Sequence, residues 1–262
     1  MFSNRFNCSV EILSSPRLKR SYNQALFTHI ASIYPLATQL LSWRRDAAWK
    51  AKLISLLPIL KQPVIVDLAC GSGDLTSLLL KRYPDGSILG VDLTGAMLLQ
   101  ARKRVTSPRA SFQIGDMDQL ALKDESVDLI SGGYALRNAP DLKNTLVEVY
   151  RILKPNGIAA FLDFSKSPSP LIQLVSLSLL KFWCSLWGII LHRDPNTYGY
   201  IVKSLLHFPD RIRMNALLNQ QHFEVLVSRP VFFGFAQLTI VKKSVTTQEG
   251  PYELKVQHRT PA

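Results

Sequence analysis

Cysteine is scarce in this sequence, and its few positions exclude two kinds of protein. The 262 residues contain three cysteines, Cys8, Cys70 and Cys184, which lie far apart and without the spacing of metal ligands. An odd number without a framework excludes a disulfide-stabilised secreted domain, and the wide spacing predicts no metal site. We therefore expect a reducing, cytoplasmic location.

A signal sequence and a nucleic-acid module are lacking too. The first twenty residues are polar and contain no apolar core of signal-peptide length, so no secretory signal is expected. An organellar transit peptide stays open as an alternative, although Glu11 argues against it. Aromatic residues do not alternate with Lys or Arg as they do in a stacking platform, so nucleic acid is not expected as a partner.

Acidic residues are sparse where basic ones are dense. The formal net charge is +12, and the first fifty residues carry only Glu11 and Asp46 as acids. The basic residues in this stretch are Arg5, Arg17, Lys19, Arg20, Arg44, Arg45 and Lys50. This imbalance favours peripheral contact with an anionic membrane over nucleic acid, and a solvated basic surface is an equal alternative.

Strand-like and helix-like segments alternate through most of the chain. Strands are expected at residues 64–69, 87–92, 110–115, 127–133, 157–163, 223–228 and 235–241, with helices near 74–83, 94–104 and 141–154. This alternation predicts an α/β fold with a doubly wound, Rossmann-like, mostly parallel sheet of seven strands, the last two forming a hairpin at its far edge. The hydrophobic content of 47% supplies an ample core.

The remaining segments define the expected boundaries of one domain. Residues 1–20 are expected to be a flexible N-terminus, residues 21–243 the domain with N-terminal helices at 21–57, and residues 244–262 a disordered tail. Residues 168–206 interrupt the alternation as a helical cap. Within that cap, Leu171–Leu191 is apolar enough to cross a bilayer, and a buried cap helix, an interfacial helix and a membrane span all stay open, in that order of preference.

A glycine turn between two predicted strands is the most informative motif. The run Asp67-Leu-Ala-Cys-Gly-Ser-Gly-Asp74 follows the first strand, and Asp92 ends the second, where its carboxylate can accept both hydroxyls of a ribose. A dinucleotide would favour a third glycine at Thr76 and would disfavour the negative charge of Asp74. S-adenosylmethionine carries positive charges instead of phosphates, so the motif favours this methyl donor, with NAD as the alternative.

Two further segments follow the third and fourth strands. Gly115-Asp116-Met117-Asp118 can bond and cover an adenine ring, whereas a turn cap is the structural alternative for Asp116. Gly132-Gly-Tyr-Ala-Leu-Arg-Asn138 ends the fourth strand at the crevice where the strand order reverses. Arg137 and Asn138 are thus expected beside a transferred methyl group, and a solvated surface arginine is the alternative.

Several motifs together resemble the ubiquinone/menaquinone biosynthesis C-methyltransferases, a family of class I S-adenosylmethionine-dependent methyltransferases. They are Asp67–Thr76, Asp92, Leu136-Arg-Asn138, Arg151-Ile-Leu-Lys-Pro155, Asp163-Phe-Ser-Lys166 and Tyr198-Gly-Tyr200 with Phe208-Pro209. The resemblance covers residues 27–242 and implies methyl transfer to a ring carbon of a prenylated quinol. A different phenolic or amine acceptor, and a cyclase or complex subunit that transfers no methyl group, stay as alternatives, as does a homodimer.

The glycine turn, the strand ends and the resemblance together give a set of expected site residues. Contacts with S-adenosylmethionine are expected at Asp67, Ala69, Gly71, Ser72, Gly73, Asp92, Leu93, Asp116, Met117 and Gly133. Arg137 and Asn138 are expected to stabilise a developing phenolate, and Tyr34 or a water molecule to relay its proton. The guanidinium of Arg137 stays protonated and is not itself a base.

The sequence departs from the family pattern on the acceptor side. The family has Tyr-Asp-x-Met-Asn followed by Ser, His and Trp, where this chain has Tyr34-Pro-Leu-Ala-Thr38 and then Ser42, Asp46 and Trp49. Asp163 replaces a glutamate, and Asn156 replaces a glycine. The donor-side motifs are intact, so these departures concern the identity of the acceptor and not the type of reaction.

Overall fold

The alternation of strands and helices is present in the computed structural model, which describes residues 6–167 and 169–244. Seven strands form one sheet in the order β3-β2-β1-β4-β5-β7-β6. They are β1 (Val64–Leu68), β2 (Ser87–Asp92), β3 (Ala110–Ile114), β4 (Val127–Gly133), β5 (Leu153–Phe164), β6 (Phe223–Val231) and β7 (Ala236–Lys243). The first five strands run parallel, and β7 pairs antiparallel with β5 and β6. The predicted doubly wound sheet with an edge hairpin is confirmed.

Helices and short turns connect these strands. They are α5 (Asp74–Arg82), α6 (Gly95–Arg104), the 3-10 turn η1 (Leu136–Asn138), α7 (Leu142–Ile152), α10 (Arg211–Gln220) and the 3-10 turn η2 (Phe232–Gly234). The strand β5 begins at Leu153, four residues before its predicted start, and the backbone at Asn156 has φ 63°. Asparagine tolerates this left-handed conformation, so it can stand where the family has glycine. The helix α10 was not anticipated.

The N-terminal region is more ordered than the sequence predicted. It contains α1 (Val10–Ser14), α2 (Pro16–Ile30), α3 (Tyr34–Leu41) and α4 (Asp46–Ser55). Of the segment expected to be flexible at residues 1–20, most of the described part is helical, and residues 1–5 lie outside the description. A serine caps each of the first two helices, since the Ser9 hydroxyl accepts from the Ile12 N–H and the Ser15 hydroxyl from the Leu18 N–H. Pro16 occupies the first turn of α2, where it is well tolerated.

The expected cap is helical and consists of α8 (Pro170–His192) and α9 (Gly199–His207). The helix α8 is long and apolar enough to cross a membrane by length and composition alone. Only Leu180, Cys184 and Gly188 on its inner side are buried, so most of its surface faces solvent. The predicted tail at residues 245–262 lies outside the described residues.

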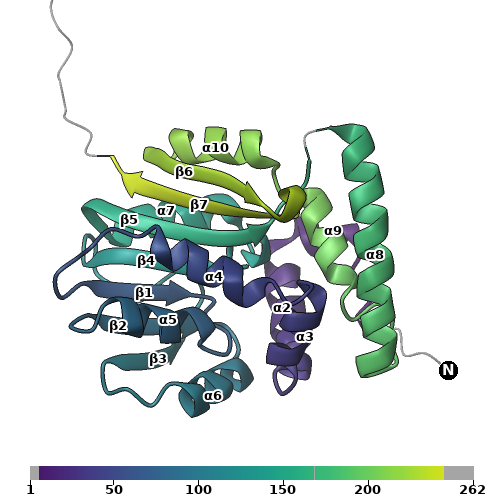
Figure 1. Ribbon diagram of the computed structural model, residues 1–262, viewed down its shortest axis with the longest axis horizontal. Coiled ribbons are helices and arrows are strands. Elements are labelled where there is room, and N and C mark those ends of the chain that lie inside the picture. Colours follow the sequence, from purple (N-terminus) through teal and green to yellow (C-terminus); the bar gives the residue numbers. More distant parts are fainter. Residues whose placement is uncertain (1–5, 168, 245–262) are drawn as a thin grey trace, which may run out of the picture.

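Helices cover the end of the sheet at which the parallel strands terminate. In Figure 1 the strands are stacked from β6 at the top to β3 at the bottom, and α2, α3, α8 and α9 gather at the right-hand end. The arrowhead of β1 points toward this end, so the carboxyl ends of the parallel strands meet the N-terminal helices and the cap there. In doubly wound sheets this edge is the usual place of a ligand site.

Candidate active site

The glycine turn at the end of β1 is held by its own backbone and by one carboxylate. Gly71 and Gly73 have φ of 55° and 78°, conformations that glycine adopts without strain. The Asp92 side chain accepts hydrogen bonds from the Gly71 N–H at 2.9 Å and from the Thr94 N–H at 2.8 Å. Each carboxylate oxygen can accept a second bond, so Asp92 keeps acceptor capacity for two hydroxyls. It is 8% exposed, and burial raises its pKa above the usual value.

A cavity of about 620 Å³ opens in front of this turn. We call it the loop cavity, and its volume includes space that is open to solvent. Seven of the predicted donor contacts line it: Ala69, Gly71, Asp92, Leu93, Asp116, Met117 and Gly133. The combination of a backbone turn, a carboxylate with free acceptor capacity and an apolar cover fits a nucleoside.

The other three predicted donor contacts do not line the loop cavity. Asp67 is fully buried, and its carboxylate accepts from the hydroxyls of Thr76 and Ser131 at 2.6 Å each, while burial raises its pKa to about 6. It borders a smaller cavity that adjoins the turn. The Ser72 hydroxyl donates to Asp74 at 3.1 Å, and Gly73 is the N-cap of α5. Direct contact of these three residues with the donor stays a prediction.

The helix α2 reaches the side of the loop cavity that Asp116 lines, which the sequence did not suggest. The Arg20 guanidinium forms ion pairs with the carboxylates of Asp116 and Asp118. Further along α2, Asn23 and Phe27 line the cavity itself. The segment expected to be flexible is therefore part of the site, and the clustered arginine and lysine at positions 19 and 20 were the only available signal.

A second cavity, of about 560 Å³, lies beside the first and is mostly apolar. We call it the apolar cavity. Its walls come from α2, α3, η1, the end of β5 and residues 197–201. It shares four lining residues with the loop cavity, namely Phe27, Tyr34, Tyr134 and Asn138. A ligand in one cavity would therefore contact the same side chains as a ligand in the other.

The three predicted catalytic residues converge on the apolar cavity. Arg137 is 4% exposed, donates to the Ser204 hydroxyl at 2.6 Å, and has its guanidinium carbon 5.7 Å from the centre of the Phe164 ring. Asn138 donates its amide N–H to the Tyr134 carbonyl at 2.7 Å, and its Oδ1 has no partner among the described residues. That oxygen can accept a hydrogen bond from a ligand hydroxyl.

Tyr34 stands between both cavities and the glycine turn. It lines the loop cavity and the apolar cavity, and a Cβ on Gly71 would lie 3.6 Å from its Cε1. Burial, reinforced by the negative charge of Asp46, raises the pKa of Tyr34 well above that of a free phenol. Tyr34 therefore stays protonated near neutral pH, and its predicted role as a proton relay stays a prediction.

The diverged Asp46 has a defined structural role behind the site. Its carboxylate accepts from the Tyr134 hydroxyl and from the Lys50 ammonium, at 2.8 Å each, and Lys50 also reaches Asp74 at 3.4 Å. Asp46, Lys50 and Tyr134 are buried, and Asp74 is half-buried. The hydrogen bond to Asp46 fixes the position of the Tyr134 hydroxyl, and the Lys50 ammonium compensates the charge of Asp46. Removing either charge would leave the other buried and uncompensated. Position 46 was noticed as a departure from the family, whereas its partners Lys50 and Tyr134 were missed.

Asp163, near the end of β5, holds η1 in place through a hydrogen bond. Its Oδ2 accepts the Leu136 N–H at 3.1 Å, at the start of the Leu-Arg-Asn turn. Burial raises its pKa to about 7, although the nearby charge of Arg137 acts in the opposite direction. Among the described residues, no group of His, Cys, Asp or Glu side chains is arranged to hold a metal ion.

Comparison with known proteins agrees with this architecture. The profile of the ubiE/COQ5 methyltransferase family matches residues 16–241. The ubiquinone/menaquinone biosynthesis C-methyltransferase UbiE of Dinoroseobacter shibae is 30% identical over 223 residues, which are 82% of this chain and 88% of that protein. The demethylmenaquinone methyltransferase of Chlamydia caviae is 31% identical over 84% of this chain and 95% of its own length.

Solved structures support the fold at lower identity. A chain from the Haloferax volcanii complex between the Trm112 methyltransferase activator and a methyltransferase has a TM-score of 0.63 at 18% identity, and the match covers 84% of this chain and 98% of that one. The family profile covers most of the chain, and the motifs that suggested the resemblance lie within it. The chain belongs to the ubiE/COQ5 methyltransferase family and is a methyltransferase.

Proposed function

We propose that this protein transfers the methyl group of S-adenosylmethionine to a ring carbon of a lipophilic quinol or phenol in quinone biosynthesis. The observation that carries the proposal is the pair of adjoining cavities, one formed by the glycine turn and Asp92 and the other apolar and containing Arg137. Four shared residues form their boundary, where a methyl group would pass. The names of the relatives point to the same class of acceptor.

The composition of the apolar cavity supports a phenolic acceptor over an amine. No carboxylate is among the described residues that line it, whereas Arg137 is. A protonated amine would be repelled by the guanidinium, while a phenolate would be stabilised by it. The apolar walls on α2 and α3 suit a prenyl tail.

The residues of the cavity have distinct roles in the proposed reaction. When bound, the donor supplies an electrophilic methyl group on a positively charged sulfur. The Oδ1 of Asn138 would accept a hydrogen bond from the hydroxyl group of the methyl acceptor and so orient its ring. The Arg137 guanidinium would stabilise the phenolate that develops. Tyr34, or a water molecule, would relay the hydroxyl proton. The ring carbon would form the new C–C bond while the electron pair of the C–S bond stays on sulfur, and the carbon would then lose its proton to water, which restores the ring.

Location and membrane contact belong to the same proposal. A lipophilic quinol partitions into a bilayer, so an enzyme that uses it gains from peripheral association with that membrane. The net charge of +12 favours an anionic leaflet, and a cytoplasmic enzyme would meet it at the inner face.

The proposal is tested by transfer of isotope-labelled methyl groups to candidate acceptors. The purified protein, labelled S-adenosylmethionine and a chemically reduced demethylated quinone should yield a product labelled on a ring carbon. The oxidised quinone is the matched control, because its ring is electron-poor and should accept no label. A label on oxygen or nitrogen, or none on any quinol, would contradict the proposal. Quinones extracted from cells that lack the gene should show the demethylated species by mass spectrometry.

A further inference from the structure

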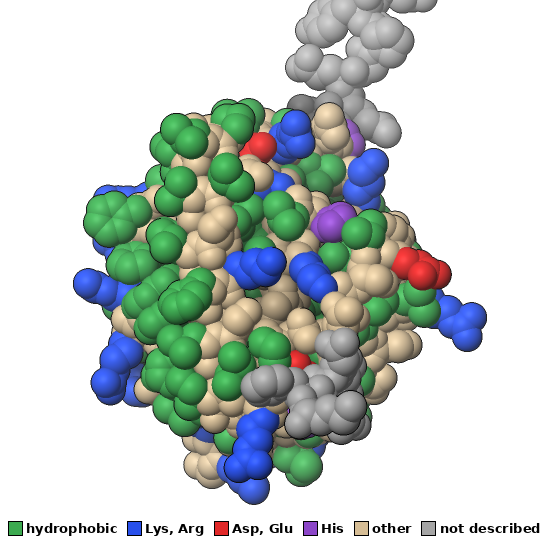
Figure 2. Space-filling model, turned by 90° about the vertical axis from the view of Figure 1, so that its right-hand side faces the viewer, with side chains coloured by type: hydrophobic (Ala, Val, Ile, Leu, Met, Phe, Trp, Pro, Cys, Tyr) green, Lys and Arg blue, Asp and Glu red, His purple; other side chains and the backbone are tan. Residues whose placement is uncertain are grey.

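The outer side of α8 is apolar and uncovered. Leu171, Leu174, Leu179 and Phe182 are 72%, 66%, 59% and 69% exposed, while Leu180 and Cys184 on the opposite side are buried. Helices that are apolar on all sides are normally enclosed, either in a protein core or in lipid. Figure 2 shows the consequence as a band of hydrophobic side chains that runs down this face of the molecule. Apolar areas of this kind mark interaction sites.

The inner side of α8 ties the helix to the rest of the fold. The Trp183 indole N–H donates to the Leu40 carbonyl of α3 at 3.1 Å, and the Trp43 and Trp183 rings stack with centres 5.6 Å apart. A Cβ on Gly188 would lie 2.5 Å from the Asp194 carbonyl, so the helix packs directly on the loop that follows it. Crossing a bilayer would require these contacts to break. The helix can therefore present its outer side to lipid only while lying along the surface.

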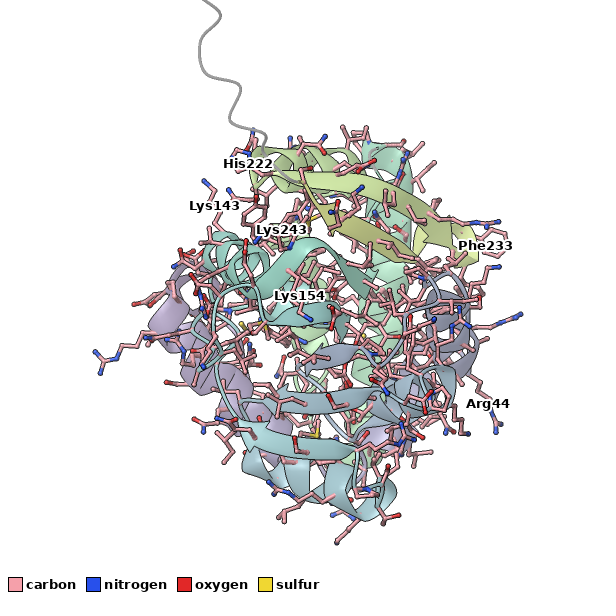
Figure 3. The ribbon with its side chains drawn as sticks, turned by 90° about the vertical axis from the view of Figure 1, so that its left-hand side faces the viewer. Arg44, Lys143, Lys154, His222, Phe233 and Lys243 are labelled. Atoms are coloured by element: carbon pink, nitrogen blue, oxygen red, sulfur yellow. The ribbon has the colours of Figure 1, made fainter. Side chains whose placement is uncertain are left out.

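A second apolar feature adjoins this face at the β6–β7 turn. Phe233 is 95% exposed, and both Phe232 and Phe233 have positive φ, of 49° and 56°. Bulky residues rarely adopt this conformation, because it costs free energy. The Phe232 ring lies 5.5 Å from the Trp43 ring, which in turn stacks on α8. Figure 3 shows Phe233 projecting from the end of the hairpin on the same side as Arg44.

The charges around the face determine which occupant fits it. From position 170 to 207 the only acidic residue is Asp194, which is buried, while Lys181 and Arg193 are exposed. Arg44 and Arg45 are exposed next to Trp43, whose ring contacts α8. A second copy of the chain would bring these cations against each other, whereas anionic headgroups would neutralise them. Aromatic and apolar side chains between cations match the boundary between headgroups and acyl chains.

We propose that the outer side of α8 and the Phe233 turn form a docking surface for an anionic lipid bilayer, with α8 lying parallel to the membrane plane. This inference names the surface through which the proposed membrane association would occur, and it rests on that proposed function. The helix α3 forms a wall of the apolar cavity and also contacts α8 through Leu40, so the docked enzyme would hold that cavity close to the bilayer. A lipid-like acceptor could then enter from the membrane without crossing water.

Vesicle flotation tests the surface with matched variants. The full chain is mixed with phosphatidylcholine vesicles with or without phosphatidylglycerol, and partition is measured over a salt series. The variant Leu171→Gln/Leu174→Gln/Phe182→Gln should lose at least about tenfold in partition, because three side chains no longer enter the interface. The control Ile59→Gln/Leu99→Gln/Val147→Gln changes equally exposed apolar residues outside this face and should bind as the wild type does. Lys181→Gln should lose about fivefold, and only with phosphatidylglycerol at low salt.

Phe233→Gly separates docking from folding. Glycine accepts the positive φ without strain, so thermal stability should stay equal or rise while lipid partition falls several-fold. Loss of stability together with binding would indicate that Phe233 is structural, which would remove the turn from the proposed surface. Wild-type protein that fails to float on anionic vesicles at low salt would overturn the proposal. So would a wild-type dimer in sedimentation that the α8 variant converts to monomers.

A methyl-transfer assay in detergent micelles keeps this inference distinct from the proposed reaction. The α8 variant should methylate a micelle-solubilised quinol at the wild-type rate, because no changed residue lines either cavity. If wild-type protein floats but methylates no quinol, the proposed acceptor fails and the docking surface stands. If it methylates the quinol but does not float, the docking surface fails and the reaction stands.

Discussion

The two cavities of this protein are built by different means, although they share a wall. The loop cavity takes most of its lining from the ends of neighbouring strands, and the Gly71 N–H and the Asp92 carboxylate are joined directly. The apolar cavity takes side chains from α2, α3, η1 and residues 197–201, which are far apart in the sequence. The side that would hold a common donor thus depends on backbone geometry, whereas the side that would select an acceptor depends on helix packing.

The largest expected effect concerns the acceptor side. Replacing Arg137 by Ala should lower turnover by about 10²- to 10³-fold, because a buried positive charge beside the developing phenolate is lost. Donor affinity should stay within a few-fold of wild type, since Arg137 does not line the loop cavity. Single-turnover kinetics and calorimetry measure the two quantities. Unchanged turnover with bound donor would remove Arg137 from the catalytic residues.

The buried acid behind η1 gives the acceptor side a pH dependence. In the folded state the pKa of Asp163 is raised to about 7, so between pH 4 and 7 the folded chain binds more protons than the unfolded chain. The free energy of unfolding therefore falls as pH rises through this window, because Asp163 loses its proton less readily in the folded state. Asp163→Asn, which keeps an acceptor for the Leu136 N–H, should be more stable than wild type by about 1–3 kcal/mol at pH 8 and nearly equal at pH 4. Urea unfolding at both pH values checks this, and a variant that is less stable at pH 8 would reverse the assignment.

On the donor side, Asp92 should dominate affinity. Its carboxylate keeps capacity for two hydroxyls, and a hydrogen bond to a charged group contributes about 1.5–3 kcal/mol. Asp92→Ala should therefore weaken donor binding at least about tenfold by calorimetry. Asn138→Ala is the comparison, because it should lower turnover more than donor affinity. Equal donor affinity in wild type and Asp92→Ala would show that the donor does not bind at Asp92 in the loop cavity. Tight binding of NAD would show that the glycine turn binds a dinucleotide and not a methyl donor.

The apolar cavity should respond to the length of the acceptor tail. Each methylene buried in it should raise affinity by about 0.8 kcal/mol, or roughly fourfold, until the walls are filled. A series of acceptors with one ring and increasing tails, measured as KM against kcat, gives the dependence. If KM does not change with tail length, the acceptor is a small polar molecule and the cavity does not select for lipid.

The smallest effect is expected at Ser72. Its hydroxyl donates to Asp74 and is absent from the lining of the loop cavity, so Ser72→Ala should change donor affinity by less than about fivefold. Calorimetry beside Asp92→Ala provides the scale. A loss as large as that of Asp92→Ala would show that the glycine turn moves toward the donor when it binds.

The sequence predicted the donor side better than the acceptor side for a physical reason. A parallel strand that ends in Asp92 and a turn that needs Gly71 and Gly73 are local patterns, and the sheet brings their ends together. The hairpin at the far edge of the sheet follows equally from local sequence. Arg137 and Asn138 were predicted from their position after the fourth strand, and Tyr34 was added together with the family resemblance. The structure places all three around one cavity.

What was missed depends on contacts between distant segments. No local pattern links Arg20 to Asp116, or Asp46 to Tyr134 across 88 positions. The order of residues 9–20 was missed because their composition is polar, and their helices gain stability from serine caps and from ion pairs formed elsewhere. The cap was predicted as a helix, but only residues 197–201 of it line the apolar cavity, while α8 faces outward.

The helix α2 contributes to the walls of both cavities. Phe27 belongs to the walls of both cavities, Asn23 donates to the Asn138 carbonyl, and Arg20 holds the same helix to Asp116. A shift of this helix would therefore change the walls of both cavities at once, so that binding in one cavity would be coupled to binding in the other.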